Sequence, residues 1–371
     1  MKDELNIDLL KRLCETPGVP GREERVRALI EEEIQGLFDE VRVDALGSLI
    51  CTRHPRPKGA SGAKGGSKKV SRKAGGSSDS PRRVMLLSHM DEIGFYVSHI
   101  DDKGFIRVNP AGGFDPRNLF SRRVLVCTSG GDLKAVMNPG GRPIHISSPE
   151  ERSNVPEVKD FFVDTGMPAE EVREKVRIGD YVVMDEPLIE IGTKVVSKAL
   201  DNRFACWLGI ESIRKLHKSG SGHACEIVVA FTTQEEVGLR GAKTASYAVR
   251  PDIGLGIDVS LACDTPGVPE AEAVTQQGKG FGLHIQDASF IANHELVDQI
   301  EAIAKKKRIA YQRTILARGG QDGAAAQQAA AGAKAVGIVC GTRYIHTVTE
   351  MIDRRDLAAA RDIVAAALAV L

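Results

Sequence analysis

Apolar runs alternate with amphipathic segments in the first quarter and in the second half of the chain. Four of the runs have the length and composition of buried strands, and turn or charged residues bound them. They are VMLLS at 84–88, EIVVAFT at 226–232, DIGLGIDV at 252–259 and AKAVGIVC at 333–340. Shorter strands are expected near 41–43 and 48–51.

Segments with apolar positions at helical spacing separate these strands. Two amphipathic helices are expected within residues 3–37, with a break at 16–21, where Pro and Gly interrupt the pattern. Further helices are expected at 201–218, at 294–307, within 321–333 and at 354–371. This alternation of strand and helix is typical of an α/β domain.

The middle section of the chain follows a different pattern. Residues 94–190 contain short strand-like runs between Gly and Pro turns, namely GFYVSHI, GFIRV, RRVLVCT, LKAVM and DYVVMD. The pattern predicts a small β-rich domain within the α/β domain. We therefore expect residues 1–93 and 188–371 to form the α/β domain and residues 94–187 to form an inserted β-barrel-like domain.

Charge is balanced over the whole chain, with 50 basic and 50 acidic residues, which argues against a general nucleic-acid or membrane-surface protein. Residues 53–83, however, contain ten Lys or Arg and one acid, and are rich in Gly and Ser. Such a segment buries too little apolar surface to offset chain entropy, so we expect a flexible basic insertion. A nucleic-acid or targeting role for it is the less favoured alternative.

The cysteines and the N-terminal residues indicate the cellular compartment in which the protein is expected. Seven cysteines are scattered along the chain without a CxxC pair, which favours a reducing environment over a disulfide framework. The first residues, MKDELNIDLLKRL, lack the apolar core of a signal peptide, and no apolar run approaches the length that crosses a bilayer. A cytoplasmic protein is expected.

Chemistry-bearing side chains stand just past the predicted strands of the α/β domain. In open α/β sheets the carboxyl ends of the strands line the crevice where ligands bind, so these residues are expected to converge there. Asp201 differs in that it opens a predicted helix. The full set is His89, Asp91, Asp201, Glu235, Glu236, Asp258 and His346.

Two histidines and several carboxylates without cysteine form a ligand set that suits zinc, cobalt or manganese. Each residue alone is weak evidence, and Asp201 alone would be an ordinary helix N-cap. The adjacent pair Glu235 and Glu236 is explained if one carboxylate holds a metal while its neighbour acts as a base on a water shared by two metals.

These residues lie in motifs that resemble a known family, the co-catalytic dinuclear metal aminopeptidases that include glutamyl, deblocking and tetrahedral aminopeptidases. The matching stretches run nearly end to end, and three of them together are highly specific: HMDEIGF, ALDNR and QEEVGLRGA. The resemblance implies a three-layer mixed-sheet metallopeptidase domain. It also implies an inserted domain used for dimerisation, and a dimer-based homo-oligomer that can reach a dodecamer.

The resemblance assigns a role to each residue of the set. It makes His89 and Asp258 ligands of one metal, Glu236 and His346 ligands of the other, and Asp201 the bridge between them. Asp91 orients His89, and Glu235 is the general base. The implied reaction removes N-terminal residues from short peptides by attack of a metal-bridging water, with two divalent ions per subunit, expected to be zinc, with cobalt or manganese as the alternatives.

Some motifs depart from the family pattern. The chain has GGQDGA at 319–324 and HTVTE at 346–350, where the family has GGTDAG and HSPVE, and both are expected to flank the site without supplying ligands. Two other functions stay open. One is a hydrolase of the same scaffold that acts on N-acyl amino acids or, as the names of some relatives suggest, on glucans. The other is a non-catalytic binding protein that uses the basic insertion.

Overall fold

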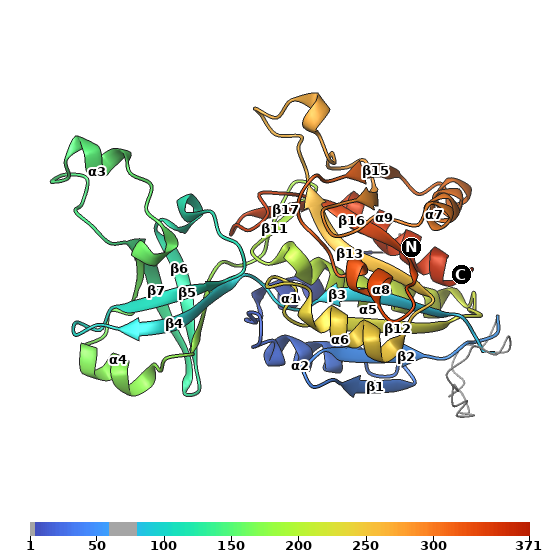
Figure 1. Ribbon diagram of the computed structural model, residues 1–371, viewed down its shortest axis with the longest axis horizontal. Coiled ribbons are helices and arrows are strands. Elements are labelled where there is room, and N and C mark those ends of the chain that lie inside the picture. The colour runs from blue at the N-terminus through green and yellow to red at the C-terminus, as the bar shows by residue number, and fades with distance from the viewer. Residues whose placement is uncertain (1–3, 59–79) are drawn as a thin grey trace.

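The computed structural model describes residues 4–58 and 80–371, which form an α/β part and a smaller barrel beside it (Figure 1). The chain passes into the barrel between β3 (Arg83–His89) and β4 (Gly94–Ile100). It returns between β9 (Tyr181–Met184) and β10 (Ile189–Ile191). The predicted fold, a mixed-sheet α/β domain with an inserted barrel, is confirmed. Most of the predicted basic insertion, residues 59–79, lies outside the described residues.

Among the described residues, an eleven-stranded mixed sheet forms the centre of the α/β part. Nine strands follow one another in the order β1-β2-β12-β3-β13-β16-β17-β11-β10, and β14 and β15 branch from β16. The neighbours β12, β3, β13 and β16 run parallel, so their carboxyl ends meet at one edge. The remaining bounds are β1 (Glu40–Val43), β2 (Leu49–Arg53), β11 (Lys194–Ser197), β12 (Glu226–Thr232), β13 (Ile253–Leu261), β14 (Phe281–Gln286), β15 (Tyr311–Ile315), β16 (Lys334–Arg343) and β17 (Glu350–Asp353).

The central strands are apolar on both faces because helices cover both sides of the sheet. In β3, Val84 and Leu86 join the larger core, whereas Met85 and Leu87 point to the smaller core on the other face. The larger core includes side chains from α1 (Ile7–Glu15), α2 (Glu24–Glu33), α5 (Leu200–Ser219), α7 (His294–Lys307) and α9 (Arg354–Leu368). The smaller core includes side chains from α6 (Arg240–Val249) and α8 (Gly323–Gln328).

The barrel is closed, with the strand order β4-β5-β8-β7-β6-β9 and with β9 pairing back to β4. Its own core contains Phe95, Met137 and Phe161, and Val348 from the α/β part joins that core. Short helices lie in its connections. The bounds are β5 (Ile106–Ala111), η1 (Pro116–Leu119), β6 (Arg122–Thr128), β7 (Gly131–Pro139), α3 (Pro149–Ser153), η2 (Val158–Asp160), β8 (Phe161–Asp164) and α4 (Ala169–Lys175). A further short helix, η3 (Glu270–Glu272), belongs to the α/β part.

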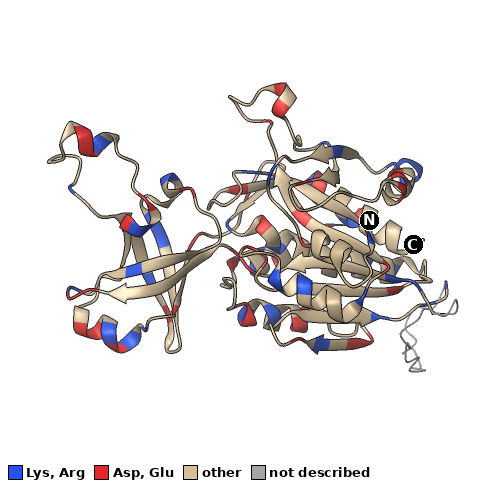
Figure 2. Cartoon of the chain, viewed as in Figure 1, with Lys and Arg blue, Asp and Glu red and all other residues tan. Residues whose placement is uncertain are grey.

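Basic and acidic residues are interspersed over both parts, as Figure 2 shows. This distribution agrees with the balanced composition. A search of the described residues found no helix that is both long enough and apolar enough to cross a membrane.

Candidate metal centre

The predicted site residues meet where the parallel strands end. His89 is the last residue of β3, and it stands in register with Thr232, the last residue of β12. Glu235 and Glu236 follow in the turn after β12, and Asp258 lies in β13 on the other side of β3. Parallel pairing thus brings groups from three separate stretches of sequence to one edge of the sheet.

The carboxylate of Asp201 lies between the two histidines. One of its oxygens, Oδ1, is 3.4 Å from Nε2 of His89, and the other, Oδ2, is 3.3 Å from Nε2 of His346. The same nitrogen of His346 lies 3.4 Å from Oε2 of Glu236. Ligand atoms that bind a zinc ion tetrahedrally at about 2.0–2.1 Å are about 3.3–3.4 Å apart. These separations therefore match those of atoms that share an ion.

Two overlapping groups of side chains can each hold a cation. His89, Glu235 and Asp258 form one group, and His89, Asp201 and Glu236 form the other. Within each group the ligand atoms lie within 4.8 Å of one another. All of these ligand atoms are nitrogen or oxygen, which suits divalent zinc, cobalt or manganese. The donor set therefore fits divalent cations.

Because this cluster is buried, its carboxyl groups are costly to ionise unless positive charge is added nearby. Burial raises the pKa of Glu235 and Asp258 well above the usual range, and it raises that of Glu236 with help from the charge on Asp201. For His89, burial acts to lower the pKa, but nearby carboxylates, Glu235 first among them, raise it well above its usual value. A dry cluster of this kind takes up protons or divalent cations to balance its charge.

Asp91 holds several members of the cluster in place. Its carboxylate accepts the backbone N–H of Glu235 at 3.0 Å and that of Glu236 at 3.1 Å. Its backbone carbonyl lies 3.1 Å from Nδ1 of His89. When Nδ1–H donates to that carbonyl, Nε2 of the neutral ring is left free to bind a cation. Metal-bound histidines generally need such a partner.

Three further carboxylates support the site, and none of them was assigned a role from the sequence. Glu350 accepts the backbone N–H of Asp201 at 2.9 Å and that of His346 at 2.8 Å. Glu23, from the N-terminal segment, accepts the backbone N–H of Gln234 at 3.0 Å. The available signals were weak: Glu350 follows His346 by four residues in HTVTE, and Glu23 is one of many helical acids.

The third of these carboxylates, Asp322, comes from the GGQDGA stretch. It is buried and accepts a hydrogen bond from the hydroxyl of Thr232 at the end of β12. Burial raises its pKa to about 6. Asp322 belongs to neither of the two groups of described side chains that can hold a cation.

Comparison with known proteins identifies the class. A curated protein of Acetivibrio thermocellus, named as an aminopeptidase, is 34% identical over 96% of each chain. A solved aminopeptidase from Desulfurococcus kamchatkensis is 34% identical, with a TM-score of 0.85 over 98% of this chain and 94% of that one. The TET1 peptidase of Pyrococcus horikoshii, which can assemble into a tetrahedron or a large octahedral shell, is 29% identical, with a TM-score of 0.81 over 98% of both chains. The chain is an aminopeptidase, a hydrolase of peptides.

A match to a family model identifies the family to which this chain belongs. The family model for M42 glutamyl aminopeptidases matches residues 69–363, which is most of the chain. The protein therefore belongs to the M42 glutamyl aminopeptidase family.

Proposed function

We propose that this aminopeptidase uses two divalent metal ions to remove N-terminal residues from short peptides. One observation carries the proposal: the two oxygens of Asp201 face two different histidines, each within 3.4 Å. A bridging carboxylate between two ligand sets is the arrangement that a hydrolytic metal pair requires. In this assignment His89 and Asp258 hold one ion, and Glu236 and His346 hold the other.

When bound, two divalent cations supply a Lewis acid for the peptide carbonyl and lower the pKa of water. Glu235 then takes the proton from the attacking water and later delivers it to the leaving amine. Its burial favours this role, because a raised pKa suits a carboxylate that must both accept and release a proton. The carboxylate of Asp91 fixes the backbone of Glu235, so the base is held at the site.

Paired variants test this division of roles. Glu235→Gln is expected to lower kcat by about 10²–10⁴-fold while metal content measured by plasma emission spectroscopy stays at the wild-type level. Glu236→Gln is the matched control, since it makes the same change one residue on and is expected to lower metal occupancy. Full activity in both variants, or metal loss in Glu235→Gln alone, would contradict the assignment.

The metal and the substrate are tested together. Metal analysis of the purified protein, followed by reconstitution with zinc, cobalt or manganese, is expected to show about two ions per chain. Aminoacyl anilides, acylated amino acids and glucans should be offered in parallel. Hydrolysis of glucans alone would overturn the peptidase mechanism in favour of the same-scaffold alternative. Salt-sensitive binding to nucleic acid without any hydrolysis would favour the binding-protein alternative.

We also propose a cytoplasmic homo-oligomer built from dimers that associate through the barrel. The support is the solved TET1 peptidase, which can assemble into a tetrahedron or a large octahedral shell, together with the scattered cysteines of this sequence. Membranes and nucleic acids are not expected as partners.

A further inference from the structure

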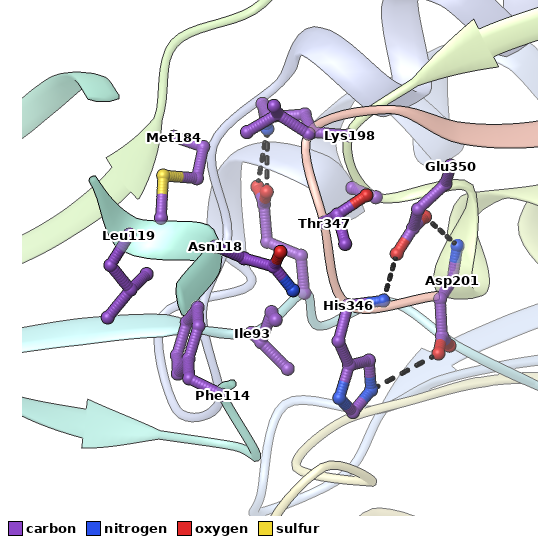
Figure 3. Close-up of a pocket in the computed structure, with 13 residues that line it drawn as sticks. Ile93, Phe114, Asn118, Leu119, Met184, Lys198, Asp201, His346, Thr347 and Glu350 are labelled. Carbon is purple, nitrogen blue, oxygen red and sulfur yellow. Dashed lines mark hydrogen bonds and ion pairs between the residues drawn. The ribbon is translucent and has the colours of Figure 1, made fainter. Parts of the chain in front are cut away.

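A pocket opens beside the candidate metal centre, between the barrel and the α/β part (Figure 3). His346, Asp201 and Glu350 lie on one side of it. The side chains on the opposite side come mainly from the barrel and are largely apolar. The apolar residues that line the pocket are Ile93, Phe114, Leu119, Met184, Ala199 and Val348.

The apolar wall is fixed by the barrel core. Leu119 and Met184 are buried, at 0% and 8% exposure. The ring of Phe114 stacks on Phe95, with 4.3 Å between the ring centroids, and Phe95 lies in the barrel core. These side chains therefore present a formed apolar surface to a ligand at the metal centre.

The charged groups nearest the apolar wall are already paired with one another. The ammonium of Lys198 lies 2.6 and 2.9 Å from the two carboxylate oxygens of Glu92, and both side chains are buried. Arg203 also donates to Glu92, at 3.3 Å. Among the described residues that line the pocket, Lys198 is the only Lys or Arg, and its ammonium is already engaged by Glu92. Burying a charged ligand side chain against the apolar wall without a partner is strongly unfavourable.

We propose that this pocket receives an aliphatic side chain of the peptide substrate, at one of the two residues that flank the scissile bond. The proposal rests on the proposed function. The pocket adjoins Asp201 and His346, so a peptide held at the metal centre places one of these side chains there. The pocket is narrow, with a cavity volume of about 20 Å³. It therefore favours aliphatic groups over aromatic rings as well as over charged side chains.

Two series of dipeptides test whether the pocket selects aliphatic side chains and whether the first or the second residue of the substrate fills it. In one series the first residue varies among Gly, Val, Leu, Phe, Glu and Lys before a constant Gly, and in the other series the second residue varies after a constant Gly. The metal-loaded enzyme is used, and kcat/KM is measured by liquid chromatography. In the series whose varied residue fills the pocket, Val and Leu are expected to exceed Gly, Phe, Glu and Lys in kcat/KM by at least about ten-fold.

Variants connect that preference to the pocket wall. Met184→Lys places a cation in the wall and is expected to lower kcat/KM for Val and Leu at least about ten-fold and to raise it for Glu. Asn118→Asp is an isosteric second variant at the pocket rim, where it adds a negative charge and should favour Lys instead. The matched control is Val136→Lys, on an exposed barrel position with 42% exposure, and it should leave all ratios unchanged.

Each outcome bears on one proposal or on both. The assignment is supported if one series shows an aliphatic preference and both wall variants, Met184→Lys and Asn118→Asp, reduce that preference. Hydrolysis without aliphatic preference in either series, or a preference that both wall variants retain, overturns the assignment while the proposed function stands. If the metal-loaded enzyme hydrolyses none of the dipeptides, the proposed function is overturned and this assignment with it.

Discussion

At the residue scale, buried carboxylates outnumber histidines at the candidate metal centre. Glu235, Glu236 and Asp258 all have a raised pKa, chiefly because they are buried. Burial opposes protonation of His346, but hydrogen bonds to Asp201 and Glu236 raise its pKa to about 12. Asp201 alone shifts the other way: burial opposes its ionisation, but its two histidine partners hold its pKa below the usual range. In the metal-free protein these groups together therefore bind more protons in the folded state than in the unfolded state.

The stability of the metal-free protein should consequently fall as pH rises. The stabilisation from His346 is complete below its unfolded value of 6.5 and is lost as pH rises toward about 12. The carboxylates with raised pKa add to the loss, because they resist ionisation above their unfolded values of 3.8–4.5. Scanning calorimetry of chelator-treated protein should show a lower Tm at pH 8.5 than at pH 6.5. Added metal should raise Tm more at pH 8.5, because its ligands must be deprotonated. A Tm that rises with pH after chelation would contradict this account.

Glu23 offers a test of positioning at a residue outside the ligand set. Burial, aided by the charge of Asp91, raises its pKa to about 7. Glu23→Gln keeps an oxygen that accepts the N–H of Gln234, so kcat should stay near that of wild type. Glu23→Ala removes the acceptor and should lower kcat roughly ten-fold to a hundred-fold, because the adjacent Glu235 loses its support.

The pH dependence of stability separates these two variants from a general loss of packing. Ionising Glu23 is unfavourable between its unfolded value of 4.5 and about 7, so wild-type stability includes a component that falls across that window. Both variants should remove this component, which denaturant unfolding at pH 5 and at pH 7 would measure. If the alanine variant retained full kcat, Glu23 would have no positioning role.

The ligand-type residues could be predicted because they follow recognisable strands, and parallel strands bring their ends together. The structure gathers His89, Asp201, Glu235 and Glu236 at one place, as that argument requires. The supporting residues could not be predicted in the same way. Glu350 and Glu23 act by accepting backbone N–H groups, and such contacts depend on the fold of distant segments and leave no periodic mark in the sequence.

At the element scale, the long apolar strands were predictable, whereas one helix of small residues was missed. The four predicted buried strands correspond to β3, β12, β13 and β16. The prediction had no helix at α6, whose sequence RGAKTASYAV buries mainly small side chains that give little apolar contrast. The helix expected within 321–333 is confined to Gly323–Gln328. Glycine at position 332, with φ of +88°, marks the turn that separates α8 from β16.

Close packing of β13 against the loop before α8 gives an element-scale prediction. A Cβ on Gly256 would meet the side chain of Gln321 and would lie 2.9 Å from Cα of Gly323. Gly256→Ala should therefore displace the loop that carries Asp322 and lower the free energy of unfolding by about 1–3 kcal/mol. The matched control is Gly130→Ala, whose Cβ would meet only Thr128 at 3.8 Å. Equal stability of the two variants in urea unfolding would contradict this packing argument.

At the scale of the whole molecule, the change from long apolar runs to short ones predicted a separate barrel. The structure has that barrel, closed by pairing between β4 and β9. Assembly could not be predicted from composition, because interfaces between copies differ little from the rest of a surface in bulk hydrophobicity. Light scattering of the full-length protein should give a mass of two or more chains, and a strictly monomeric mass would contradict the proposed homo-oligomer.

The connection between β3 and β4 ties the two parts closely. Only four residues, 90–93, separate His89 from the first barrel strand. The ligand-type residues thus belong to the α/β part. Phe114, Leu119 and Met184, in the wall of the neighbouring pocket, belong to the barrel. Mutation can alter the barrel side of that wall while every ligand-type residue is retained. Evolution can therefore change which peptides such an enzyme accepts while conserving the reaction that it performs.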